Sequence, residues 1–529
     1  MGLFGRYLTA AGLLAAAAGA LGAQAAEKPK CDIDAAYKGN LARASLSLGV
    51  AQQAATTPIG AAKLKETVKT LETPDKDADP VARSYLLGSA LSLWLNQPNV
   101  GATPKRSVVG FTTNPDATID LVPTIDSLFR IVEAFKPNCQ DYTNYYRGGQ
   151  KYYIDVANAA IKALNEDKLD SAEYYATQAN RLFPASPYGT MVLGSVAQKR
   201  NNTPKAVEYW TASADVAARD TMYRDVRRQM LVNIGSTELA AANAASGAER
   251  TAAARRAAAA YGKLIEMPGT KGSYLYGGRQ NLQTALLLAG DTAAFVQTYQ
   301  PLLQNPTSYE YQDLLNSAVN AARTAKAADA ARLFEATLAQ NPYSRDALYN
   351  LAVTYLALDQ NDKVGPIATR LVAVDPGNPD NYNLGARAYL ALAKSAQAAK
   401  RNPAVAAYND TTLSWFNRGN KLPVEVTFSE FTPTDKQIIV GGTVLDRRDK
   451  VDAGTTDTRP TRGKAAPKPA AKNLPPKAVT LNFQALDRSG AVVGSKSVTT
   501  EALTPGKTAK FTVTIDAPNA VAYRYTIAD

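Results

Sequence analysis

The stretch Tyr349-Asn350-Leu351-Ala352-Val353-Thr354-Tyr355 decides the fold, and its start returns 33 residues later as Tyr382-Asn383-Leu384-Gly385. Two antiparallel helices approach closely where both carry small residues at the contact. A proline then ends the second helix, because it lacks an N–H and disfavours helix in the residue before it. Small residues recur twelve positions apart at Ala160 and Ala172, at Gly194 and Ala206, and at Ala318 and Ala330. In the first and third of these sets a proline follows after twelve more residues, at Pro184 and Pro342. This spacing predicts stacked helical hairpins.

These motifs resemble the tetratricopeptide repeat (TPR) family. The stretch 349–355 is similar to the first helix of that repeat, and Thr203-Pro-Lys-Ala206-Val-Glu-Tyr-Trp210 is similar to the second. Clear matches cover 152–217 and 316–392. The segment 218–315 is degenerate, and its glycine-rich part, Pro268–Arg279, is expected to be a loop. The resemblance implies a TPR-like α-α solenoid over 142–422.

Beyond Leu422 the apolar residues no longer recur with the period of a helix but stand at every second position. Val424, Val426 and Phe428 alternate with polar residues, which predicts antiparallel strands with one buried face. We expect five to seven strands in a small β-sandwich over 423–529. Three segments resemble the FxLYD group of bacterial β-sandwich domains, although another immunoglobulin-like sandwich fits as well: Val440-Gly-Gly-Thr-Val444, Leu486-Asp-Arg-Ser-Gly490 and Leu503-Thr-Pro-Gly506 leading to Phe511. The predicted fold class is multidomain and mainly α, a solenoid followed by an antiparallel sandwich.

The first residues have the pattern of a secretory signal peptide over 1–25. Arg6 precedes an apolar run, Tyr7–Leu21, and Ala23-Gln24-Ala25 forms a cleavage site before Ala26. The alternative is a membrane anchor, but the run is shorter than the ~20 strongly apolar residues that span a bilayer. We expect Sec export to the periplasm or beyond the cell, with no membrane span after cleavage.

Cys31 and Cys139, the two cysteines of the chain, lie in an expected N-terminal helical domain over 26–141. In an oxidising compartment they predict one disulfide, which would close a loop of about 108 residues. A redox or metal pair is the alternative, but no Cys-x-x-Cys occurs.

The chain contains no histidine. This excludes Ser-His-Asp nucleophiles and histidine-ligated zinc. Phosphate-binding and dinucleotide-binding glycine motifs are also missing. Paired carboxylates for glycoside hydrolysis stay open, because acids from distant helices can meet. We expect no enzyme, no cofactor and no metal.

The net charge of +12 is concentrated in one segment, because 447–477 carries nine Lys/Arg and three Asp. We expect 447–478, rich in Pro, Ala and Lys, to be a disordered loop of the sandwich. Its candidate contacts with an anionic envelope polymer are Arg447, Arg448, Arg459, Arg462, Lys464, Lys468 and Lys472. A solvated spacer is the alternative. The segment has no aromatic residue for base stacking, so we expect no specific nucleic-acid binding.

The TPR resemblance implies a partner-binding groove built from the first helix of each hairpin. The matching positions are Tyr188, Met191, Tyr349, Asn350, Val353, Tyr382, Asn383 and Ala386. They include no Lys/Arg clamp for a C-terminal carboxylate, and ordinary packing between repeats is the alternative for each. The leading hypothesis is an exported scaffold that binds a protein or peptide partner. The alternatives are a self-assembling structural or envelope component and a cell-wall or polyanion-associated protein.

Overall fold

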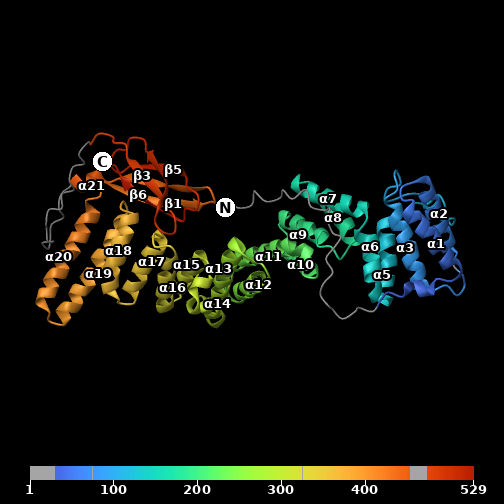
Figure 1. The fold of residues 1–529 in the computed structure, drawn as a ribbon, viewed down its shortest axis with the longest axis horizontal. Helices are drawn as coiled ribbons and strands as arrows, with labels where there is room; N and C mark the ends of the chain where they lie inside the picture. Colours follow the sequence, from blue (N-terminus) through green and yellow to red (C-terminus); the bar gives the residue numbers. More distant parts are fainter. Residues whose placement is uncertain (1–29, 74, 325, 453–473, 529) are drawn as a thin grey trace. The chain divides into compact units, whose positions relative to one another are not determined.

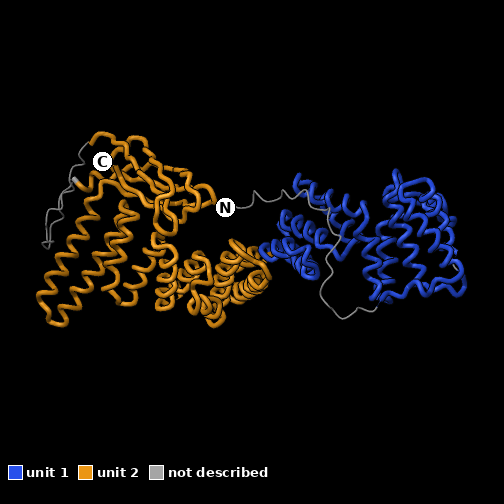
Figure 2. The backbone as a smooth tube through the Cα atoms, viewed as in Figure 1, with its two compact units in different colours: residues 1–233 blue, residues 234–529 orange. Residues whose placement is uncertain are grey.

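The computed structural model describes residues 30–73, 75–324, 326–452 and 474–528. The chain forms two compact units, one up to residue 233 and one from residue 234 (Figure 2). The boundary falls inside the segment that we expected to be one solenoid. The predicted signal peptide lies outside the described residues. Within the described part, no helix has both the length and the apolar character needed to cross a bilayer.

Unit 1 is built from helices joined by short turns (Figure 1). Its elements are η1 (Ile33–Ala36), α1 (Gly39–Gln53), α2 (Pro58–Glu72), α3 (Pro80–Trp94), α4 (Arg106–Val109), α5 (Leu121–Phe135), η2 (Pro137–Cys139), α6 (Gln140–Gly148), α7 (Lys151–Asn165), α8 (Leu169–Leu182), α9 (Tyr188–Lys199), α10 (Thr203–Ala217) and η3 (Thr221–Tyr223). The next helix, α11 (Arg224–Ala244), crosses the unit boundary. Neighbours in sequence pack as pairs, among them α1–α2, α7–α8 and α9–α10. The predicted contact residues Ala160, Ala172 and Ala206 are buried.

A buried arginine joins three helices of unit 1. The Arg147 side chain is 1 % exposed and forms ion pairs with Asp126 and Glu133 of α5. It also donates to the backbone carbonyls of Arg181 and Leu182 at the end of α8. A buried charge is stable only with partners of this kind, so α6 is held against both helices.

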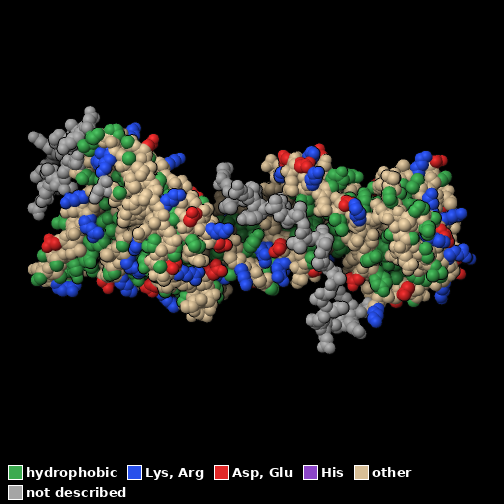
Figure 3. All heavy atoms as spheres, turned by 45° about the horizontal axis from the view of Figure 1, so that its top comes forward, with side chains coloured by type: hydrophobic (Ala, Val, Ile, Leu, Met, Phe, Trp, Pro, Cys, Tyr) green, Lys and Arg blue, Asp and Glu red, His purple; other side chains and the backbone are tan. Residues whose placement is uncertain are grey.

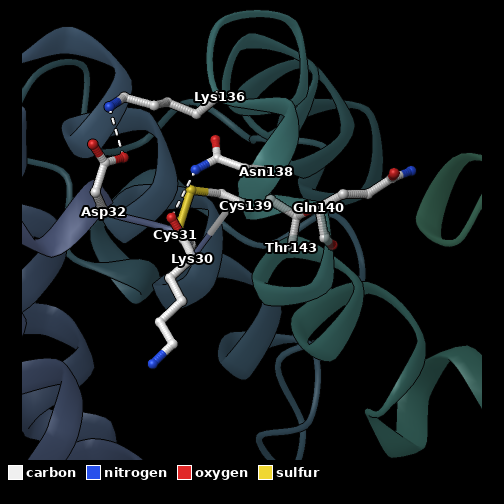
Figure 4. Close-up of a disulfide and its surroundings, with 8 residues drawn as sticks. All are labelled: Lys30, Cys31, Asp32, Lys136, Asn138, Cys139, Gln140 and Thr143. Atoms are coloured by element: carbon white, nitrogen blue, oxygen red, sulfur yellow. Dashed lines mark hydrogen bonds and ion pairs between the residues drawn. A yellow bond between two sulfur atoms is a disulfide. The ribbon is translucent and has the colours of Figure 1, made fainter. Parts of the chain in front are cut away.

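The predicted disulfide between Cys31 and Cys139 is present (Figure 4). It joins the first described residues to η2, across a sequence separation of 108. Two flanking contacts support it: Lys136 pairs with Asp32 at 2.8 Å, and the Asn138 amide donates to the carbonyl of Lys30 at 2.9 Å. For a loop of this length the chain-entropy model gives a stabilisation of about 4–5 kcal/mol.

Unit 2 contains the helices α12 (Gly247–Ile265), α13 (Gly272–Leu288), α14 (Thr292–Gln304), η4 (Pro306–Ser308), α15 (Tyr311–Ala322), α16 (Ala327–Gln340), α17 (Arg345–Ala357), α18 (Asn361–Val374), α19 (Pro379–Ala398) and α20 (Asn402–Asn420). Contacts run within the pairs α15–α16, α17–α18 and α19–α20, and also from α13 to α15, α15 to α17 and α17 to α19. Contacts between alternate helices of this kind are typical of an α-α solenoid.

The degenerate segment is helical throughout most of its length. The loop predicted over Pro268–Arg279 is wrong for most of its residues, because α13 begins at Gly272. Glycine weakens a helix by only about 1 kcal/mol per residue, and packing compensates here. Gly278 lies against Leu264 and Ile265 of α12.

Glycine on one helix beside an aromatic ring on its partner recurs in the hairpins. A Cβ added to Gly385 of α19 would lie 2.5 Å from the ring of Trp415 on α20, and one added to Gly235 would lie 2.7 Å from Tyr261. Gly194 and Trp210 have the same relation in α9 and α10. The Trp210 ring therefore lies against the first helix of its own hairpin.

The described residues of the C-terminal part form six antiparallel strands, and the predicted fold class is confirmed. The strands are β1 (Val424–Pro433), β2 (Gln437–Asp446), β3 (Thr480–Leu486), β4 (Val492–Thr499), β5 (Thr508–Asp516) and β6 (Ala522–Ile527). Two three-stranded sheets, ordered β1-β2-β5 and β4-β3-β6, enclose a core that includes Phe483 and Phe511. Whether this sandwich belongs to the FxLYD group stays a prediction.

The first residues of the predicted disordered loop are ordered. Residues Arg448–Asp452 form a short helix, α21, directly after β2. The backbone N–H of Arg447 also donates to the carbonyl of Pro423, at 2.8 Å. These contacts are tertiary, which is why composition alone suggested a loop.

We predict that Gly385→Ala lowers the stability of unit 2 by about 1–3 kcal/mol, because the new methyl overlaps a buried tryptophan ring. Gly277→Ala is the matched control, since a Cβ there meets nothing within 4 Å. The control should raise stability by roughly 0.5–1 kcal/mol through helix propensity. Urea-unfolding midpoints of the two variants and the parent give the comparison. Equal midpoints for both variants would contradict the proposed contact.

Candidate functional site

Strands β1 and β6 of the sandwich contact the loops between helices of the same unit. The strands β1 and β6 are edge strands, and both contact the loop between α18 and α19. The backbone N–H of Val426 in β1 donates to the carbonyl of Gly377 at 2.9 Å. The Tyr525 hydroxyl in β6 accepts from the Gly377 amide at 2.9 Å and donates to the Asp375 carboxylate at 2.7 Å. Exposed strand edges invite unwanted pairing, and here the loop covers the start of β1, while the rest of that strand is exposed.

The loop between α16 and α17 makes a second set of contacts. The Asn341 amide donates to the carbonyl of Val521, just before β6. Tyr343 lies against Gly490 in the β3–β4 turn. The φ angle of Gly490 is +87°, a conformation that glycine adopts without strain. The two loops therefore fix the orientation of the sandwich on the helices of unit 2.

Arg345 stands at the first turn of α17, where helix and sandwich meet. Its guanidinium lies 4.8 Å from the centre of the Phe428 ring in β1, a cation–π contact. The guanidinium also donates to the Asp346 carboxylate at 3.0 Å and to the Tyr523 hydroxyl at 3.3 Å. Its hydrogen-bonding capacity is largely used inside the protein.

Burial raises the pKa of the Asp375 carboxyl above its ordinary value. The hydrogen bond from Tyr525 opposes this rise, because it stabilises the charged form. Burial also raises the pKa of the Tyr525 hydroxyl, and the charge of Asp375 adds to that rise. Tyr525 therefore stays a donor to Asp375 over the ordinary pH range.

A groove of about 280 Å³ opens beside this contact. It lies where the first turns of α17 and α19 meet strand β1, and all of its lining belongs to unit 2. Its lining residues are Arg345, Asp346, Tyr349, Asn350, Asp375, Asn378, Asp380, Asn381, Thr427 and Phe428. Ser344 and Asn378 cap the two helices through their side chains, which places Asp346 and Asp380 in the first turns.

The structure separates the predicted groove residues into three sets. Tyr349 and Asn350 line the groove, and Val353 lies exposed one turn further along α17. Tyr382 and Ala386 are buried in a cluster with Trp415, while Asn383 is partly exposed. Tyr188 and Met191 are partly buried on α9 of unit 1, where Tyr188 meets Tyr223 edge to face.

Sequence reasoning missed the acidic and β-strand parts of the lining. Asp346 and Asp380 each stand two residues after a helix-capping residue, so the capping pattern was the available signal. Asp375, Thr427 and Phe428 had no such signal. Asp375 directly follows α18, whereas Thr427 and Phe428 reach the groove only because the sandwich folds back onto the helices.

The predicted polyanion contacts are only partly described. Arg447 is 8 % exposed, bonds to the carbonyl of Gly419 and lies 3.7 Å from Glu425. Arg448 donates to the Asp446 carboxylate at 2.6 Å. The remaining candidates, Arg459, Arg462, Lys464, Lys468 and Lys472, lie outside the described residues. In Figure 3, basic and acidic side chains are interspersed over the visible face of each unit.

Comparison with known proteins gives no family assignment. No protein-family model and no curated protein matches the chain. A tetratricopeptide repeat protein from Parabacteroides merdae is similar in structure, with 14 % identity, a TM-score of 0.27, and coverage of 49 % of this chain and 98 % of that one. A Pseudomonas aeruginosa pilF structure has 13 % sequence identity and a TM-score of 0.19, and the match covers 48 % of this chain and 88 % of that one. The TPR domain of P58(IPK) has 12 % sequence identity and a TM-score of 0.19, and the match covers 74 % of this chain and 90 % of that one. These TM-scores are below 0.5, so the fold rests on the chain's own helices and strands.

We predict that Tyr525→Phe lowers the stability of unit 2 by about 2–3 kcal/mol near neutral pH, because it leaves the Asp375 carboxylate and the Gly377 amide without their partner. The loss should shrink as the pH falls. A carboxyl whose pKa is raised on folding binds its proton more tightly in the folded state, so protonation favours folding and the penalty of the buried charge acts above the raised pKa.

Thermal unfolding between pH 4 and pH 8 measures this effect. Tyr408→Phe on α20 is the control, and its stability should follow the parent at every pH. In the Tyr525→Phe background, Asp375→Asn should remove most of the added pH dependence, because the amide has no charge. An equal loss at all pH values would show that the hydroxyl does not act through the carboxylate.

Proposed function

We propose that this protein is an interaction scaffold that binds an extended segment of a partner protein in the groove between α17, α19 and β1. The observation that carries the proposal is the groove itself. Two rigid helix starts and a docked strand hold an aromatic face and several polar side chains around a cavity of about 280 Å³. Sites on such supports are more precise than sites on free loops.

Tyr349 is the central candidate for partner contact. Its side chain is 37 % exposed, in a position where the TPR resemblance implies partner binding. Tyrosine contributes a large, rigid surface to interfaces and often dominates their energy. Asn350 beside it has an amide oxygen for a backbone N–H of the segment.

We propose that the groove does not catalyse a reaction. Glycoside hydrolysis needs one carboxyl of raised pKa that reaches the substrate and a second, ionised one. The carboxyl of raised pKa in the groove is that of Asp375, which is 1 % exposed and already bonded to Tyr525. Asp346 and Asp380 are exposed, but the groove lining offers neither of them an accessible carboxyl of raised pKa as the general acid.

We further propose that the chain acts outside the cytoplasm, on the pattern of residues 1–25 and the disulfide. Expressed with its own N-terminus in a bacterium, the protein recovered from the periplasm should have the intact mass of a chain starting at Ala26, with no free thiol. Ala25→Phe should block cleavage, because the site needs small residues. Recovery of the uncleaved chain with two free thiols would overturn export. Self-assembly and contact with an anionic polymer stay predictions from the sequence.

Selection of peptides that bind the full chain, from a displayed random library, tests the scaffold proposal. We expect peptides whose affinity falls about tenfold or more in Tyr349→Ala, as for other aromatic anchors. Tyr174→Ala is the matched control, since Tyr174 is an exposed tyrosine on α8 of the other unit. Selected peptides that bind both variants as they bind the parent would show that the groove is not the binding site. Light scattering in the same buffer reports self-association.

A further inference from the structure

Each asparagine amide around the groove already donates one hydrogen bond within the protein. The Asn350 amide donates to the carbonyl of Asp346 at 2.8 Å, and the Asn381 amide donates to the carbonyl of Asp375 at 2.8 Å. The Asn378 amide points to the Asp375 carboxylate at 3.4 Å. Arg345 is held by Asp346, Tyr523 and Phe428, as described above. A ligand would therefore find few donors here.

Several side-chain oxygens of the groove lining, by contrast, have few or no hydrogen-bond donors within the protein. The Asp380 carboxylate has no hydrogen bond or ion pair to another described residue, and its side chain is exposed. Asp346 shares its carboxylate with Arg345 but is 63 % exposed. Asn381 is 1 % exposed, and its Oδ1 has no hydrogen-bond partner among the described residues. A buried acceptor without a donor is unfavourable, so Asn381 adds no free donor to this region.

The charge of the groove lining also favours a positively charged ligand. Three aspartates and one arginine line the groove, in a chain whose net charge is +12. The groove is therefore acidic on a protein that repels cations overall. The Tyr349 ring adds a face that attracts a cation, as aromatic rings do within about 6 Å. Exposed carboxylates and an aromatic face together suit a positively charged donor.

We propose that the groove recognises a lysine or arginine side chain of an extended partner segment. This inference rests on the proposed function and adds the chemistry of the partner to it. The ammonium or guanidinium group donates to the carboxylates of Asp346 and Asp380, and the segment lies along the first turns of α17 and α19. Both carboxylates are exposed, so the attraction is screened by salt and sets specificity more than total affinity.

Four labelled nonapeptides of Ser and Gly test the inference by fluorescence anisotropy on the full chain. Three spaced positions carry Lys in the first peptide, Arg in the second, Gln in the third and Glu in the fourth. We expect the Lys and Arg peptides to bind at least about tenfold more tightly than the Gln peptide at low salt. The advantage should diminish as salt is added.

Asp346→Asn with Asp380→Asn should remove most of this advantage. The matched control is Asp362→Asn with Asp170→Asn, which also removes two first-turn aspartates, from α18 and α8. The control should leave binding within about twofold of the parent. Equal thermal midpoints of the two double variants show that folding is not the cause.

The outcomes separate the two proposals. If Gln or Glu peptides bind as tightly as Lys peptides and Tyr349→Ala weakens them, the groove binds peptides but the cationic specificity is overturned. If the Lys advantage survives Asp346→Asn with Asp380→Asn, the specificity is overturned as well. If no peptide depends on Tyr349, or none binds, the proposed function fails together with the inference.

Discussion

The hydrogen bonds that Tyr525 makes with Asp375 and Gly377 hold the sandwich on the helices of unit 2, and the groove exists only because of that docking. They join the last strand of the sandwich to the loop before α19, while Val426 joins the first strand to the same loop. A three-on-three sandwich has exposed edges, and such edges aggregate unless they are covered. Docking on the helices covers the start of β1 and part of β6, and it places β1 beside the first turns of α17 and α19.

The groove is a consequence of that docking. Its inner side comes from the first turns of two helices, and its outer side comes from β1. The same contacts that hold the sandwich consume the nearby donors, because Arg345 and the asparagine amides bond to neighbouring carboxylates and carbonyls. Acceptors remain, and they give the groove its chemical preference. Structural support and ligand preference thus have one physical origin.

Much of the architecture was predictable because it follows local rules. The twelve-residue spacing of small side chains placed the helical hairpins, and Ala160, Ala172 and Ala206 are buried as that spacing requires. The alternation of apolar with polar residues predicted the strands of the sandwich. The error at Pro268–Arg279 has a clear reason: glycine was taken as a loop signal, whereas Gly278 fits closely against α12 and lies in a helix. Likewise, Arg447 was expected in a solvated loop but is buried by its contacts with Glu425 and Gly419.

By itself, the sequence determined the α-solenoid, the sandwich that follows it and the pairing of Cys31 with Cys139, because periodicity and the count of cysteines are properties of the chain. It also identified Tyr349 and Asn350, through the repeat pattern. Only the tertiary structure decided that Tyr382 is buried and that Asp346, Asp380 and Phe428 share a groove. The physical reason is that these contacts are long-range: Asp346 and Phe428, 82 positions apart, become neighbours only when the sheet docks on the helices, and Tyr382 is buried by Trp415 of α20.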